Sequence, residues 1–238
     1  MEEFLINYYN LLNDGVIAIA AIIGIFSYRK YKSTTTKYFI YFLIGAALVD
    51  FLGKYPLYFS RIEQLKPLLD LITDTVFINN YWWYNIFWTI GSTLFFSFYF
   101  RKLLKSQVLK RILYGASILI LVVGLGYVIF DTYHFMTAFI LPLIVINFTT
   151  IILASSFYLI EVLNSERILN FYRSINFYIA IVILIWWLVT TPIAFYEFYM
   201  SISDWKYIII KVKILLCSNM FMYLTFSIAL LWCKPQNN

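Results

Sequence analysis

The stretch GAALVDFLGKYP, residues 45–56, decides the fold because it places two charges inside an apolar run that covers residues 37–59. Asp50 lies near the middle of this run, and Lys54 follows one helical turn later. Side chains four residues apart share one face of a helix, so this carboxylate and this ammonium can pair. A charge in the middle of a bilayer is costly, so such residues face the interior of a helix bundle. The stretch therefore predicts a membrane-spanning helix whose ion pair faces the neighbouring helices of a bundle.

The composition places the whole chain in the membrane class. Of its 238 residues, 63% are hydrophobic, 21% are aromatic and 13% are charged, whereas soluble domains average about 45–50% apolar and about 25% charged residues. The acidic start, Glu2 and Glu3, lacks the basic region of a cleavable signal peptide, so the first span is expected to remain in the mature protein. Cys217 and Cys233 lie on one predicted helix, about 24 Å apart, too far for a disulfide bridge within the chain.

The hydrophobic runs predict an all-α polytopic membrane protein, a bundle of seven transmembrane helices that forms one domain over residues 1–238 without a soluble domain. The expected spans cover about residues 11–28, 37–59, 81–100, 112–130, 136–159, 176–200 and 207–232. Pro56 is expected to bend the outer end of the second span. An apolar pattern that begins at Pro67 predicts a short interfacial helix between the second and third spans.

The basic residues predict the orientation of the bundle. Twelve lie in the connections and the tail on one side: Arg29, Lys30, Lys32, Lys37, Arg101, Lys102, Lys105, Lys110, Arg111, Arg167, Arg173 and Lys234. Five lie on the other side: Arg61, Lys66, Lys206, Lys211 and Lys213. Basic connections favour the cytoplasmic face, so we expect the N-terminus outside and the C-terminus in the cytoplasm. The net charge of +6 follows from these connections, so we expect no direct nucleic-acid binding.

Polar side chains lie at matching depths in five of the predicted spans, from the midplane outward. As open lipid cannot satisfy these groups, we expect them to line an outward-facing pocket. The predicted ligand-binding residues are Asp50, Lys54, Asn85, Thr89, Asn147, Thr190, Glu197 and Asn219. The first and fourth spans carry almost nothing polar at depth and are expected to be peripheral. An alternative stays open for the Thr and Asn side chains, because such groups also serve as hydrogen bonds between helices.

The state of the charged pair also stays open. Lys54 lies in the outer half of its span, where a long side chain can extend toward the aqueous face. That arrangement would leave Asp50 partly paired and protonated at rest, which makes coupling to proton movement a possible mechanism.

The sequence motifs narrow the function classes. His134, the only histidine, lies in an outer turn, and neither a His-Glu-x-x-His nor a Gly-x-Ser-x-Gly motif occurs, so we expect no enzyme, no metal site and no cofactor. A retinal protein needs a lysine in the middle of the seventh span, where this chain has Ser218 and Asn219. We therefore favour a sensor or receptor-like module that binds a small ligand or ion and signals to a cytoplasmic partner at the basic connections. The alternatives are a small-solute or proton-coupled transporter, and a membrane accessory or effector protein of a larger system, such as a defence system.

Two local patterns carry a resemblance. The third span begins with Tyr-Trp-Trp-Tyr-Asn at residues 81–85, and the connection after the fifth span reads EVLNSERIL at residues 161–169. With its aromatic-rich helices, the chain resembles uncharacterised short seven-span proteins of bacterial inner membranes. The resemblance implies a multi-pass protein of the cell (inner or plasma) membrane and supplies no function.

Overall fold

The computed structural model describes residues 2–197 and 205–235, and within these it contains helices and no strand, which confirms the all-α prediction. The side chains of residues 2–7, 167, 197 and 206 are outside this description. In the described part of the chain, six helices are long and apolar enough to cross a membrane. These are α1 (Glu2–Tyr31), α2 (Thr36–Gly53), α7 (Gln107–Phe130), α9 (Leu141–Leu163), α10 (Ile175–Glu197) and α11 (Trp205–Trp232). The protein is therefore a helical membrane protein.

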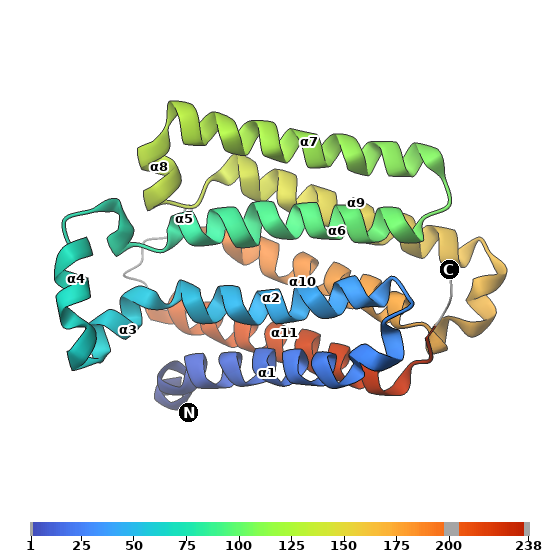
Figure 1. Cartoon of the computed structure of the whole chain (residues 1–238), viewed down its shortest axis with the longest axis horizontal. Coiled ribbons are helices and arrows are strands. Elements are labelled where there is room, and N and C mark those ends of the chain that lie inside the picture. Colours follow the sequence, from blue (N-terminus) through green and yellow to red (C-terminus); the bar gives the residue numbers. More distant parts are fainter. Residues whose placement is uncertain (1, 198–204, 236–238) are drawn as a thin grey trace.

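The segment expected as the third span is a composite helix. It consists of α5 (Tyr81–Trp83), the π-helical turn η3 (Tyr84–Ile90) and α6 (Gly91–Leu103). Figure 1 shows this segment running along the bundle beside α2. A π-helical turn shifts the backbone hydrogen bonds from four to five residues apart, and such turns are frequent at functional sites.

Short elements cover the two ends of the bundle. One end carries α3 (Tyr55–Arg61), η1 (Glu63–Leu65), α4 (Lys66–Ile72), η2 (Val76–Ile78) and α8 (Thr132–Thr137), and the other carries η4 (Glu166–Arg173) (Figure 1). The short helix expected from Pro67 is confirmed as α4. The second span is shorter than expected, because α2 ends at Gly53 and the chain restarts as α3, with Pro56 in the first turn of α3. A proline in a first turn removes no helical hydrogen bond, so Pro56 begins a new helix instead of bending α2.

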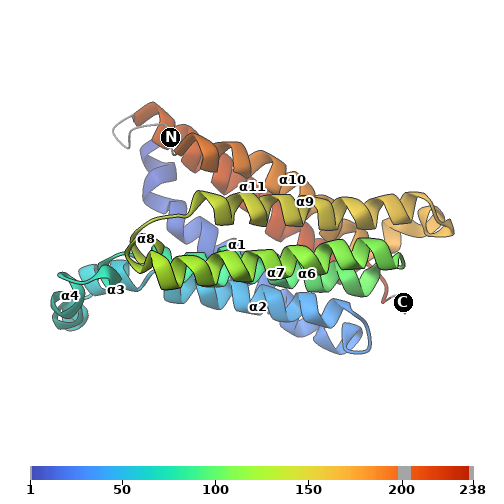
Figure 2. The same ribbon diagram turned by 90° about the horizontal axis from the view of Figure 1, so that it is seen from above.

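The long helices form a ring. Around the ring, α2 packs on α1, α1 on α11, α11 on α10, α10 on α9 and α9 on α6, and α6 contacts α2 to complete the ring. Figure 1 shows α7 along the upper edge of the bundle, outside this ring, and in Figure 2 it lies in front of α6. It packs against α6 and α9. The expected peripheral position is therefore confirmed for α7 and wrong for α1, which packs extensively against both α2 and α11.

Aromatic side chains fill the end of the ring that lies far from α3 and α4. Phe39, Tyr99 and Phe226 are almost fully buried there, and the rings of Phe39 and Phe226 lie 4.8 Å apart edge to face. The Tyr99 hydroxyl donates a 2.7 Å hydrogen bond to Asn176 Oδ1, so this layer also satisfies its polar groups. Burial of large aromatic side chains dominates the energetics of such packing. Buried aromatic side chains therefore pack this half of the bundle.

Candidate functional site

A charged triad lies where α2 meets α3. The Lys54 ammonium donates a 2.8 Å hydrogen bond to Asp50 Oδ2 and also bonds Asp14 Oδ1 from α1. The lysine side chain is 12% exposed, whereas those of Asp50 and Asp14 are 22% and 41% exposed. Lys54 therefore does not extend toward the aqueous face, which is the arrangement that the sequence suggested, but stays paired with both acids. With both acids ionised, the triad carries a formal charge of −1.

The environment of Lys54 favours its charged form. Burial by itself lowers the pKa of this ammonium, but the hydrogen bonds and the Coulombic attraction of Asp14 and Asp50 outweigh burial, so its pKa is raised above the ordinary lysine value. Lys54 is thus a fixed positive charge at neutral pH.

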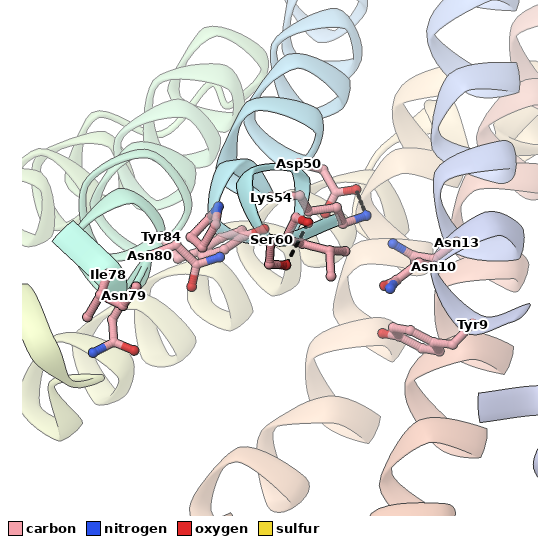
Figure 3. A pocket seen from close by; sticks show the side chains of 12 residues that line it. Tyr9, Asn10, Asn13, Asp50, Lys54, Ser60, Ile78, Asn79, Asn80 and Tyr84 are labelled. Carbon is pink, nitrogen blue, oxygen red and sulfur yellow. Dashed lines mark hydrogen bonds and ion pairs between the residues drawn. The ribbon is translucent and has the colours of Figure 1, made fainter. Parts of the chain in front are cut away.

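A polar cavity of about 570 Å³ opens beside the triad. Figure 3 shows Asp50 and Lys54 on one side and Asn10 and Asn13 of α1 opposite them, with Tyr84 on η3. Its other lining residues are Tyr9, Pro56, Leu57, Ser60, Ile78, Asn79 and Asn80. The α2–α3 break shapes this cavity, because it turns the chain outward directly after Lys54.

A second, mainly apolar cavity of about 580 Å³ lies inside the helix ring. Five of the six ring helices line it, namely α1, α2, α9, α10 and α11, and the composite helix contributes residues of α5 and η3. No residue of α6 or α7 is among its lining residues. Its aromatic lining residues are Tyr9, Tyr81, Tyr84, Trp88, Phe139, Trp186, Trp187 and Tyr223. The two cavities meet at Tyr9, Asn13, Asp50 and Tyr84, which line both. We refer to these four residues as the junction.

The structure brings most of the predicted site residues to these cavities. Asp50, Thr89, Asn147, Thr190 and Asn219 line the apolar cavity, and Lys54 lines the polar one. Asn85 lines neither cavity, since its amide donates to the carbonyl oxygens of Phe135 (2.9 Å) and Ala138 (2.8 Å) and so ties η3 to the α8 region. The side chain of Glu197 lies outside the described residues.

Asn147 supports the cavity wall by hydrogen bonding. Its Nδ2 atom carries two N–H donors, which are shared among the Thr89 carbonyl oxygen (2.9 Å), Ser92 Oγ (2.9 Å) and Thr93 Oγ1 (2.7 Å). The Thr89 carbonyl belongs to the π-helical turn, so this amide stabilises the irregular backbone. The sequence left open that Asn and Thr side chains form hydrogen bonds between helices instead of binding a ligand, and these contacts of Asn147 are of that kind.

Asn219 and Thr190 hold other parts of the wall. Asn219 Oδ1 accepts from Trp186 Nε1 (2.7 Å), and its Nδ2 donates to Asn13 Oδ1 (2.7 Å). The Thr190 hydroxyl donates to the Trp186 carbonyl one turn before it (2.8 Å). These bonds fix the indole of Trp186 between α10, α11 and α1. Asp50, by contrast, presents a charged group to both cavities.

Sequence reasoning missed the contribution of α1. Tyr9, Asn10, Asn13 and Asp14 supply one wall and one charge of the site. The signal was present, because Asn10, Asn13 and Asp14 are three and four residues apart and share a polar helix face. The expected span began at residue 11 and treated this face as a helix end, whereas α1 starts at Glu2 and carries the face into the bundle.

The described residues contain no cluster of three or more His, Cys, Asp or Glu side chains that could hold a metal ion. No protein-family model, curated protein or solved structure matches the chain. The resemblance to short seven-span bacterial proteins therefore stays a prediction, and the site is interpreted from its own geometry.

Proposed function

We propose that this chain is a seven-span protein of the cell membrane that binds a small ligand or ion in an outward-facing cavity and acts as a sensor or receptor-like module. One observation carries the proposal: the helix ring is hollow near the charged triad and closed by the aromatic layer of Phe39, Tyr99 and Phe226. A cavity open toward one end of the bundle suits binding from one side of the membrane.

The composite helix supplies the seventh span in this proposal. Its three elements cover 23 residues, Tyr81 to Leu103, which correspond to about 34 Å of helix and exceed the roughly 30 Å hydrocarbon core of a bilayer. Figure 1 shows α1 starting and α11 ending at opposite ends of the bundle, as an odd number of passes requires. The excess of basic residues at the α11 end supports a cytoplasmic C-terminus.

A mechanical link joins the cavity to the basic end. The helices α1 and α11 both line the cavity, and Lys30 on α1 donates to the carbonyl oxygens of Leu230 (3.0 Å) and Leu231 (2.8 Å) on α11. The Tyr31 hydroxyl also donates to the Cys233 carbonyl, at 2.8 Å. A ligand that shifts α1 would therefore move the C-terminal end of α11, where the basic connections offer a docking surface to a cytoplasmic protein.

A transporter is the second candidate, and the charged triad favours it. Ionisable groups within membrane spans often mark ion or proton pathways, and Asp14 and Asp50 both lie within spans. A carrier would have to open the aromatic layer toward the cytoplasm, because alternating access exposes one site to each side in turn.

The test is thiol labelling from each side of the membrane. Asn10→Cys places a thiol on the polar cavity, in a background where Cys217 and Cys233 are replaced. A charged, membrane-impermeant thiol reagent is expected to react from the outside only, with Ile22→Cys on the lipid-facing surface as an unreactive control. Reaction from the cytoplasmic side would replace the sensor with a carrier, and no reaction from either side would overturn the cavity proposal.

A further inference from the structure

The junction between the two cavities offers an incompletely used carboxylate. Of the two carboxylate oxygens of Asp50, only Oδ2 bonds Lys54 in the described part of the chain. The side chain of Asp50 is 22% exposed. Its Oδ1 atom makes no hydrogen bond to Lys54, and the carboxyl group, which also interacts with Asp14, lines the junction with Tyr9, Asn13 and Tyr84. An ammonium placed here would find a charged acceptor and neutral oxygens within one pocket.

The charge balance of the triad selects the sign of a ligand. Two carboxylates share one ammonium, so a cationic ligand would bring the cluster to neutrality, whereas an anion would face Asp50 and Asp14. Lys54 offers little to an anion, because two of its three N–H groups already bond the two acids.

The apolar cavity selects the body of that ligand. Trp186 packs edge to face with Trp88 (ring centroids 6.2 Å apart) and with Trp187 (5.0 Å), so the three indoles form one wall. The hydrogen bond from Trp186 to Asn219 fixes this wall. Aromatic faces attract cations and pack well against apolar rings, so the wall suits a flat hydrophobic group. The volume of about 580 Å³ lies within the range of about 300–1,000 Å³ typical of small-molecule sites.

Lys211 is the other charged residue that lines the apolar cavity, and it has an interaction of its own. It lies eight residues before Asn219 on α11, about 12 Å along the helix axis. Asn219 bonds Asn13 of the junction, so Lys211 lies about two helical turns along α11 from that contact.

We propose that the joined cavities bind an organic cation, with its ammonium on Asp50 at the junction and its apolar or aromatic body against Trp88, Trp186 and Trp187. This inference rests on the proposed binding function and adds the chemical class of the ligand. The polar cavity provides the route of entry, because it shares the junction and lies beside the charged triad.

The experiment compares three probes of similar shape and different charge on the full chain in lipid nanodiscs: 2-phenylethylamine, 2-phenylethanol and 3-phenylpropionate. Binding is measured by calorimetry and by protection of Asn10→Cys from the thiol reagent. The amine is expected to bind and the other two to bind about tenfold or more weakly, because a hydrogen bond between charged groups distinguishes them. Asp50→Asn is expected to weaken the amine about 10- to 100-fold, whereas Asp74→Asn, an exposed acid outside both cavities, leaves it unchanged.

Several outcomes would overturn the inference. They are failure of the amine to bind, equal binding of the alcohol or the acid, or unchanged amine affinity in a folded Asp50→Asn variant. The probe series on the unmodified chain decides the question even where Asp50→Asn does not fold. If the alcohol or the acid binds as tightly as the amine and protects Asn10→Cys, the binding function stands and only the cationic class fails. If no probe binds and Asn10→Cys stays unlabelled, both fail.

Discussion

Removal of the Lys54 ammonium should destabilise the α1–α2 end of the bundle by leaving two carboxylates without their shared partner. At the 2.8 Å separation of Lys54 and Asp50, the Coulomb attraction of a full ion pair ranges from about 1.5 kcal/mol in water to about 6 kcal/mol at an effective dielectric constant of 20. Desolvation offsets much of this gain, and the partly exposed acids regain water. We therefore expect Lys54→Met to cost about 1–3 kcal/mol, between the values for exposed and fully buried pairs.

A double-mutant cycle separates the two acids. The coupling of Lys54 with Asp50 should exceed its coupling with Asp14, because the Asp14 side chain is 41% exposed and that of Asp50 is 22% exposed. The assay is reversible unfolding in mixed detergent micelles, and Asp50→Asn should recover part of the loss in Lys54→Met. Lys66→Met is the control, since Lys66 and Glu63 are exposed and lie 3.8 Å apart. The reasoning fails if Lys54→Met costs no more than Lys66→Met, or if Asp50→Asn adds a further loss to it.

Three further predictions concern the walls and the charge of the site. Gly53→Ala should cost about 1–3 kcal/mol, because a Cβ atom there would lie 2.8 Å from Trp83 Cδ1, whereas Gly45→Ala, with nothing within 4 Å, should be neutral or slightly stabilising in the same unfolding assay. Asn147→Leu should cost about 1 kcal/mol, because it removes two N–H donors, shared among three acceptors, at about 0.6 kcal/mol per hydrogen bond, and hydrogen exchange should show the loss in η3. The pKa of Lys54 is raised, so its stabilisation is complete below the unfolded lysine value and is lost as the pH rises through the higher folded value. The difference in stability between wild type and Lys54→Met should therefore stay constant from neutral pH to about pH 10 and then shrink.

The sequence predicted the bundle well because apolar length and charge placement are local signals. The long runs of apolar residues predict α7, α9, α10 and α11, and the ends of the expected spans lie within five residues of the observed helix ends. The pairing of Asp50 with Lys54 also follows from their spacing, and the structure places them 2.8 Å apart. Local periodicity, however, does not show where a helix stops, and a glycine followed by a lysine and a proline-containing turn ended α2 earlier than hydrophobicity alone suggests.

The remaining features depend on contacts between distant segments. Asp14 reaches Lys54 across forty residues, and Asn219 reaches Asn13 across 206. No spacing rule relates such positions, so the role of α1 required the tertiary arrangement. The same limit applies to Asn85, whose depth suggested a pocket residue but whose partners are the carbonyl oxygens of Phe135 and Ala138.

The most direct test of the one-sided cavity is a measurement of water along α11. Nitroxide labels at Leu215, which lines the apolar cavity, and at Ser227, which is buried in the closed half, can be compared by the depth of deuterium modulation in heavy water. A hydrated cavity closed by the aromatic layer predicts deep modulation at position 215 and little at position 227. Equal modulation at the two positions, or deeper modulation at position 227, would contradict it.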